Sequence, residues 1–293
     1  MSCSVNLSQL EVEKIKKITE EFYRKAGIIG DVPIADDLFI ILDNLNIKLL
    51  EYPVEESAGE PAFSAALIYY MEENEEFVFM GLNTADYFDN QIYAVAHELY
   101  HYMTKTPSQL CRLSKNQDDI LESKANRFAE ELLLPEKVLT SIILKEFKNH
   151  SLEKLKDNVL LRFIARLYCT WWLPYRAIIK RLKDIDAISS QQYELLTAIN
   201  ERDNEGEFAL LCKTINQEVF NKLNLVTCRI GVSQQNIEVI IRNFEDGLVS
   251  EDQFIELLEV FNKTPEDYGY CTNLSKDDIL DINEYLDREK GKS

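Results

Sequence analysis

Histidine, glycine and proline are all scarce in this chain of 293 residues. It contains 3 histidines, 9 glycines and 7 prolines, whereas 46% of its residues are hydrophobic. This composition excludes collagen-like and low-complexity chains and favours a folded protein rich in helices. No run approaches about 18 uninterrupted apolar residues, so we expect no membrane-spanning helix. The N-terminal residues lack a basic segment followed by an apolar run, which predicts no signal peptide and a soluble, cytoplasmic protein.

Paired cysteines are also absent from the sequence. The 6 cysteines stand far apart, and no two of them form a Cys-x-x-Cys pair. This spacing argues against a zinc site built from thiolates, because such sites take their ligands from closely spaced cysteine pairs. We therefore expect the cysteines to be reduced thiols that are mostly buried.

Positive charge is the third deficit. The chain has 32 basic and 51 acidic side chains, a net charge of −19. From residue 183 onward, 11 basic side chains stand against 23 acidic ones, which gives −12 and leaves −7 for residues 1–182. Such a surface repels a phosphate backbone, so we expect no direct DNA binding. It favours a basic protein partner; the alternative is a solvated acidic surface that only promotes solubility.

Two of the few histidines stand four residues apart, in His97-Glu98-Leu99-Tyr100-His101. On an α-helix they lie about 40° apart on one face, where both imidazoles can reach one metal ion. Glu98 flanks that face and can reach a water molecule on the metal. The pattern is typical of the helix-borne zinc site of metallopeptidases. The alternative is a pair of surface or core histidines, which the low histidine content disfavours.

A second helix, predicted for residues 118–134, offers the third metal ligand. Catalytic zinc sites use three protein ligands, and Glu122 is the candidate because His150 lies in an unremarkable turn. The alternative role of Glu122 is in a capping box opened by Asp119. Asn126 lies one turn further on the same face and can accept the outer ring N–H of a ligand histidine. An ordinary hydrogen bond between helices is the alternative for Asn126.

The spacing of apolar residues predicts an α+β fold that is mostly helical, with helices over residues 8–26 and 34–45 at the start. Three β-rich runs are expected to form a small antiparallel sheet packed beside the His-Glu-x-x-His helix. They span residues 47–52, 62–71 and 76–82.

The sequence also predicts a division into three parts. These are a zinc metallopeptidase domain at residues 1–150, a helix-turn-helix-like segment at 151–185 and an acidic helical C-terminal domain at 186–293. The middle part holds the only basic clustering, so a DNA-binding regulator that uses residues 159–182 is an alternative function. Trp171 and Trp172 would crowd the turn, and we favour a structural or partner-docking role for this part.

The two helical blocks together resemble the signature of the ImmA/IrrE metallopeptidases. The likeness covers roughly residues 8–185 and rests on His97-Glu98-Leu99-Tyr100-His101 and on Glu122-Ser-Lys-Ala-Asn126-Arg-Phe-Ala129, in the order of the family. The resemblance implies that His97, His101 and Glu122 bind Zn²⁺ and that Glu98 is the catalytic glutamate. One departure is Tyr100, where members often carry a small residue.

The resemblance also implies a function: zinc-dependent cleavage of a DNA-binding repressor that controls a mobile element or a stress response. We expect the partner to be a basic helix-turn-helix protein, which an acidic enzyme attracts. A regulator that binds and titrates the repressor without cutting it is the alternative. Three tyrosines are candidates, by residue type alone, for stabilising the oxyanion. They are Tyr69, Tyr70 and Tyr102.

Overall fold

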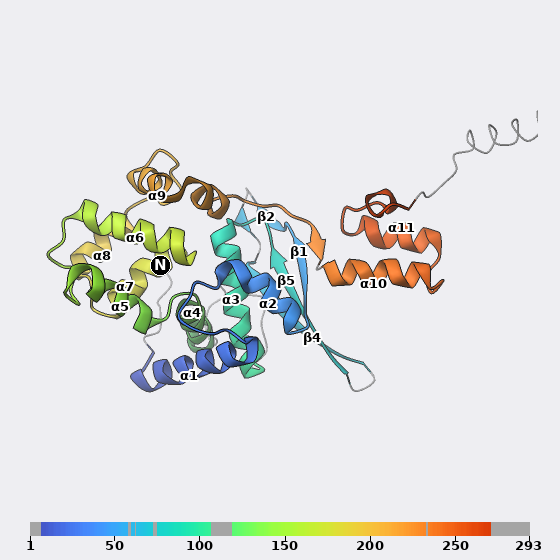
Figure 1. Ribbon diagram of the computed structural model, residues 1–293, viewed down its shortest axis with the longest axis horizontal. Helices are drawn as coiled ribbons and strands as arrows, with labels where there is room; N and C mark the ends of the chain where they lie inside the picture. Colours follow the sequence, from blue (N-terminus) through green and yellow to red (C-terminus); the bar gives the residue numbers. More distant parts are fainter. Residues whose placement is uncertain are drawn as a thin grey trace, which may run out of the picture. The chain divides into compact units, whose positions relative to one another are not determined.

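The computed structural model describes six stretches of the chain. They are residues 7–57, 60–61, 63–72, 75–106, 119–232 and 234–270. The chain divides into two compact units, Met1–Arg229 and Ile230–Ser293. Helices dominate both units (Figure 1), so the predicted mostly helical α+β fold is confirmed. In the described stretches, no helix combines the length and the apolar character that crossing a membrane requires. The predicted boundaries at residues 150 and 185 stay predictions.

The first unit begins with α1 (Gln9–Ala26), a helix closed at both ends by its own sequence. Ser8 accepts a hydrogen bond from the backbone N–H of Glu11, and the Glu11 side chain accepts one in return from the backbone N–H of Ser8. Gly27 ends the helix at φ 70°, a conformation that glycine adopts without steric penalty. The next helical elements are η1 (Ala35–Asp37) and α2 (Leu38–Asn44).

Three strands of the first unit form a small mixed sheet. They are β1 (Ile47–Tyr52), β4 (Ala65–Glu72) and β5 (Glu75–Asn83). β5 lies in the middle, with β4 antiparallel on one side and β1 parallel on the other. The expected antiparallel pairing is therefore confirmed for the second and third β-rich runs and is wrong for the first. Parallel pairing needs a long crossover, which β4 and its flanking loops supply. β5 takes the centre with Val78, Met80 and Leu82 buried.

Two further strands lie between β1 and β4. They are β2 (Glu55–Ser57) and β3 (Glu60–Pro61), which pair with each other in a short antiparallel ribbon.

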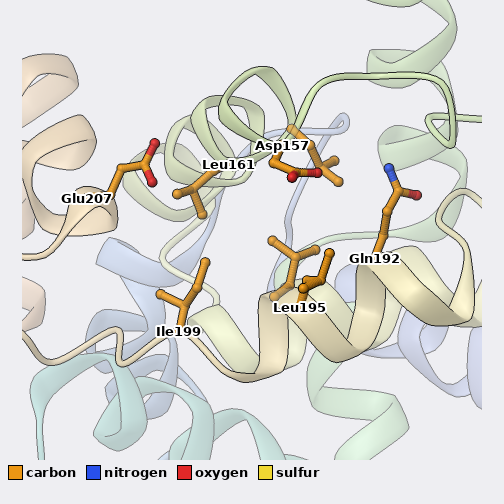
Figure 2. Close-up of a pocket in the computed structure, with 8 residues that line it drawn as sticks. Asp157, Leu161, Gln192, Leu195, Ile199 and Glu207 are labelled. Carbon is orange, nitrogen blue, oxygen red and sulfur yellow. The ribbon is translucent and has the colours of Figure 1, made fainter.

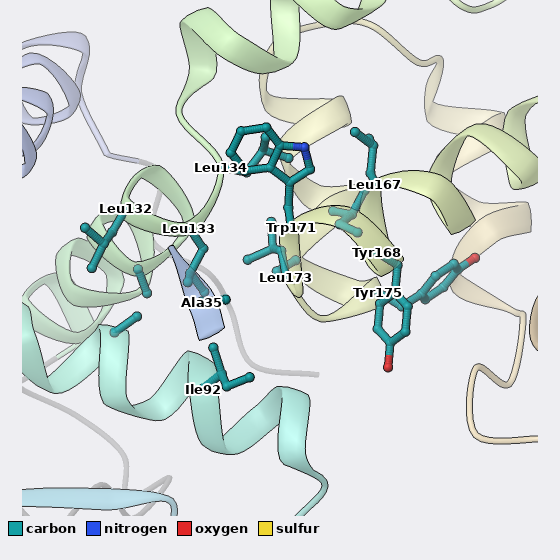
Figure 3. Packing of buried hydrophobic residues seen from close by; sticks show 14 of the residues in the cluster. Ala35, Ile92, Leu132, Leu133, Leu134, Leu167, Tyr168, Trp171, Leu173 and Tyr175 are labelled. Atoms are coloured by element: carbon teal, nitrogen blue, oxygen red, sulfur yellow. The ribbon is translucent and has the colours of Figure 1, made fainter. Parts of the chain in front are cut away.

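Two packed helices, α3 (Phe88–Thr104) and α4 (Asp119–Leu133), run through the core of the first unit. Figure 3 shows Ile92 of α3 close to the end of α4, where Leu132 and Leu133 lie. Trp171 reaches the same apolar cluster from a later helix. Each such buried side chain contributes about 1.5–3 kcal/mol to stability. Because α3 is buried along most of its length, its polar residues are held in a rigid setting.

Further helices of the first unit follow α4 in the chain. They are α5 (Glu136–Phe147), α6 (Asp157–Trp171), α7 (Tyr175–Asp184), α8 (Ser190–Thr197) and α9 (Glu207–Leu223). α6 and α7 are the helices of the expected helix-turn-helix-like segment. Among the described cysteines, Cys169 and Cys212 are buried free thiols and Cys228 is exposed.

The second unit contains a short strand and a small helical cluster. Its elements are β6 (Gly231–Val232), α10 (Gln234–Glu245), α11 (Glu251–Glu259) and η2 (Pro265–Tyr268). Phe244 stacks on Phe254 with ring centroids 4.2 Å apart, and Ile237 and Leu258 are buried beside them. The last part of the predicted acidic helical domain, residues 271–293, lies outside the described residues.

Candidate metal centre

One buried turn of α3 carries the motif residues. His97, Glu98 and His101 are 7%, 1% and 0% exposed, respectively. The two imidazole ring centroids lie 5.3 Å apart, as expected for residues one helical turn apart. Glu98 lies on the flank of this face, and its negative charge acts on His97. α3 therefore presents two metal-binding rings and one carboxylate inside the protein.

Glu122 meets this pair from α4. One of its carboxylate oxygens lies 3.1 Å from Nε2 of His97, and the other lies 3.7 Å from Nε2 of His101. One ligand atom from each of the three side chains lies within 4.8 Å of the others. Tetrahedral zinc with bonds of about 2.1 Å holds its ligand atoms about 3.4 Å apart. The structure thus brings the three predicted ligands to a separation that suits one metal ion.

His101 provides an independent test of whether a metal fits. Its Nε2 atom is buried and has no hydrogen-bond partner among the described residues. Buried polar atoms without a partner are rare in folded proteins. The other ring nitrogen, Nδ1, lies 3.0 Å from the hydroxyl of Thr106. Nδ1–H can donate to that hydroxyl, which leaves the lone pair of Nε2 for a metal ion.

Asn126 is the corresponding hydrogen-bond partner of Nδ1 of His97. Its side-chain oxygen lies 2.9 Å from Nδ1 of His97, and Tyr93 donates its hydroxyl hydrogen to the same oxygen at 3.3 Å. Nδ1–H of His97 then donates to Asn126, so Nε2 faces Glu122 with its lone pair. The sequence alone indicates Asn126 for this position but not Thr106. Only the path of the chain after α3 brings Thr106 back to His101, and residue type gave no signal for it.

The electrostatics of the cluster favour a cation. Burial opposes protonation of His97, but the hydrogen bond to Glu122 and the charge of Glu98 raise its pKa above the ordinary value. Burial, followed by the charge of His97, lowers the pKa of His101 to about 4. The cluster therefore accommodates one positive charge beside two carboxylates. A divalent cation can take the place of that single proton.

The three candidate tyrosines for the oxyanion differ in their surroundings. Tyr69 of β4 points toward α3, and its hydroxyl donates to the carbonyl oxygen of His101 at 3.4 Å. Burial and nearby carboxylates, including Glu98, raise the pKa of Tyr69 to about 12. Tyr70 is 52% exposed on the opposite face of the strand. Tyr102 is nearly buried and accepts a hydrogen bond from Nζ of Lys25.

Tyr100, the departure from the family pattern, packs between α3 and α4. It is 5% exposed, and its ring lies 5.7 Å from the ring of Phe128 on α4. The edge of the ring also contacts His101, with centroids 5.8 Å apart. Tyr100 thus fills the space between α3 and α4 and leaves the three ligand side chains together.

A peptidase family model, described as the IrrE N-terminal-like domain, matches residues 44–168. Residues 44–168 belong to the ImmA/IrrE-like family. The expected membership is therefore confirmed, and the matched segment contains both helices of the metal centre. It begins after α1 and ends within α6, so it is shorter than the likeness at residues 8–185. No curated protein and no solved structure matches the chain. The family is one of metallopeptidases, and this part of the chain is a peptidase domain.

Proposed function

We propose that the protein is a zinc-dependent endopeptidase that cleaves a protein substrate. His97, His101 and Glu122 would hold the ion. The observation that supports this best is the meeting of their ligand atoms within 4.8 Å around the unpartnered Nε2 of His101. Glu98 stands beside these ligands on a buried face, which is the position that a general base requires.

Each residue near the ligands has a part in the proposed reaction. When bound, zinc supplies a Lewis acid that polarises the peptide carbonyl and makes water acidic. Glu98 takes a proton from the attacking water and gives it to the leaving amine. Asn126 and Thr106 hold the outer ring nitrogens, which fixes the orientation of both imidazoles. Tyr69 is the best placed of the three tyrosines to donate to the oxyanion, because it points from β4 toward α3.

The sheet next to α3 supports a protein substrate. β4 pairs with β5 on one side and has no second strand neighbour among the described residues. An extended peptide can pair with such an edge as an added strand. Because Tyr69 of β4 contacts the backbone of His101, a peptide on this edge would run beside the metal centre. The acidic chain would attract a basic substrate, and we propose a DNA-binding repressor as that substrate.

Direct DNA binding by residues 159–182 has less support. Four of the basic side chains in this segment face carboxylates of the same chain. They are Arg166 with Glu146, Arg176 with Glu201, Lys180 with Glu130, and Arg181 with Glu131. Arg181 is fully buried. These side chains are engaged within the protein and are poorly placed to contact a phosphate backbone.

A single substitution, Glu98→Gln, tests the proposal. We expect it to slow cleavage by a factor of about 10²–10⁴, because the variant lacks the base but keeps the shape of the side chain. Zinc content, measured by mass spectrometry, should stay that of the wild type. The assay is proteolysis of a small basic helix-turn-helix repressor from the same genome, followed on gels with purified components.

The same variant separates the peptidase from a regulator that only binds its partner. If Glu98→Gln still relieves repression in cells as well as the wild type, titration without cleavage is the function. His97→Ala serves as the matched loss of metal, and it should lose both zinc and cleavage. If the wild type binds zinc but does not cleave the candidate repressor, the metal site is supported and that substrate is rejected.

A further inference from the structure

A groove on the first unit lies apart from the metal centre, between α6, α8 and α9 (Figure 2). It encloses about 530 Å³, including the part that is open to solvent. Its aliphatic lining includes Leu161, Leu195, Leu196 and Ile199. The space in it that water-sized spheres can occupy is about 180 Å³. That is less than the roughly 300–1,000 Å³ of small-molecule sites, so the groove has room for an apolar side chain rather than for a whole ligand.

Leu195 stands out among these residues. It is 54% exposed, whereas its neighbour Leu196 is 5% exposed and belongs to the core. The position of α8 is fixed without Leu195. The amide of Gln192 donates to the carbonyl oxygens of Leu152 and Glu153, at 3.3 and 3.4 Å. A single exposed leucine is ordinary, but one that borders an apolar groove adds to a surface that a partner can cover.

Two carboxylates border the groove, and none of the residues that line it is basic. Asp157 is the first residue of α6, and Glu207 is the first residue of α9. Neither side chain has a hydrogen bond or an ion pair within the described part of the chain. Each lies at a helix N-terminus, which stabilises a negative charge. The groove therefore combines an apolar floor with two available negative charges.

We propose that this groove binds an amphipathic segment of a basic partner protein. An aliphatic side chain of the partner occupies the space beside Leu195, and lysine or arginine residues of the same segment meet Asp157 and Glu207. This is the arrangement of an apolar anchor flanked by charge that helix-binding grooves use. The inference goes beyond the proposed peptidase activity, since binding here requires neither the metal ligands nor Glu98.

Charge argues for a basic partner over the other occupants. A second copy of this chain would bring the same carboxylates, and its net charge of −19, toward the groove. The segment at residues 271–293 has apolar side chains, but it carries 6 acidic and 4 basic residues. Like charges on both sides disfavour either of these occupants.

The test uses a synthetic fluorescent helical peptide with leucines four residues apart and lysines on the other face. We expect Leu195→Ser to weaken its binding by about tenfold or more, because the anchor loses its apolar contact. Leu210→Ser is the matched control, since Leu210 of α9 is 52% exposed and does not line the groove. It should bind like the wild type. Fluorescence anisotropy of the full chain measures all of these affinities.

A second set of variants tests the two carboxylates together, with Leu195 unchanged. We expect the double variant Asp157→Asn, Glu207→Gln to bind about three to ten times more weakly at low salt, with the difference fading at high salt. Glu256→Gln with Glu259→Gln removes the same charge from α11 and should have no effect. A peptide with serines in place of its leucines separates anchoring from simple charge attraction. Equal binding of the two peptides, or equal losses from Leu195→Ser and Leu210→Ser, would overturn the proposal.

Discussion

One helix, α4, contributes to two buried polar clusters that differ in how their charges are balanced. The metal cluster consists of His97, His101 and Glu122. The ionic cluster consists of Arg127, Glu130, Glu131, Lys180 and Arg181, and it joins the second half of α4 to α7. In the ionic cluster each carboxylate faces a cation of the same chain, as in the contacts Lys180–Glu130 at 2.6 Å and Arg181–Glu131 at 2.8 Å. The metal cluster has no lysine or arginine.

Both clusters contain buried polar atoms without hydrogen-bond partners, but these atoms have different surroundings in the two clusters. One atom each of Arg127 and Glu130, and two atoms of Arg181, lack hydrogen-bond partners in the described part of the chain, yet an opposite charge contacts each of these side chains. Among the described residues, the polar contacts of the His101 imidazole are with Thr106 and with the carboxylate of Glu122, 3.7 Å away. Burying charge is tolerated where its opposite is built in. Where the chain supplies no cation, a metal ion can supply it.

The largest effect should come from removing a ligand. His101→Ala should lower the affinity for zinc by more than about 100-fold, beyond the loss that follows when an outer partner of a ligand is changed. Zinc retained after dialysis, measured by mass spectrometry, gives the result. Arg181→Met is the matched change in the ionic cluster, and it should leave zinc content unchanged below its unfolding temperature. Full zinc retention by His101→Ala would mean that His101 is not a ligand.

Substitutions in the ionic cluster should instead lower the free energy of unfolding. Arg181 is fully buried, and Arg181→Met removes the nearer cation of Glu131, which leaves only Arg127 at 3.7 Å among the described residues. We therefore expect the free energy of unfolding to fall by about 3–5 kcal/mol. Denaturant melts of the zinc-free protein measure this loss. Arg166→Met, which breaks a more exposed pair with Glu146, should cost only about 0–1 kcal/mol. Equal losses in the two variants would show that the ionic cluster does not stabilise this fold.

Local patterns predicted much of this structure. The helix that begins near residue 8, the antiparallel pairing of β4 with β5, and the helix that carries His97 and His101 all follow from short-range spacing. Glu122 was found because two histidines leave one ligand position open. The competing role of Glu122 in a capping box depends on the side chain of Asp119, which lies outside the described residues.

The features that could not be predicted from the sequence depend on contacts between residues that are far apart in the chain. The parallel pairing of β1 with β5 is decided by which strand takes the centre of the sheet, and nothing within residues 47–52 encodes it. The basic residues of α7 were interpreted as a cluster, yet Lys180 and Arg181 face carboxylates of α4 about 50 positions earlier. The contact of Thr106 with His101 and the groove beside Leu195 likewise exist only once the helices have packed.

A smaller effect is expected from Asn126, which acts through His97. Asn126→Ala removes the acceptor for Nδ1–H and should weaken zinc binding by about 10- to 100-fold, with the fold retained. Asn126→Asp keeps an oxygen acceptor and should recover much of the affinity. Competition with a chelator of known affinity measures both variants. If both lose affinity equally, Asn126 supports the packing of α3 on α4 and does not orient His97.

The smallest effect should come from Thr106, the corresponding partner of His101. Asn126 is held on a helix and also accepts from Tyr93, whereas Thr106 follows the end of α3 and is otherwise held through the hydroxyl of Thr104 at 2.8 Å. The less rigid acceptor should orient its imidazole less strictly. Thr106→Val should therefore weaken zinc binding by no more than about tenfold, the low end of the range for such partners. Thr106→Ser restores the hydroxyl and should bind zinc like the wild type. A loss for Thr106→Val as large as that for Asn126→Ala would mean that the chain after α3 holds His101 as firmly as α4 holds His97.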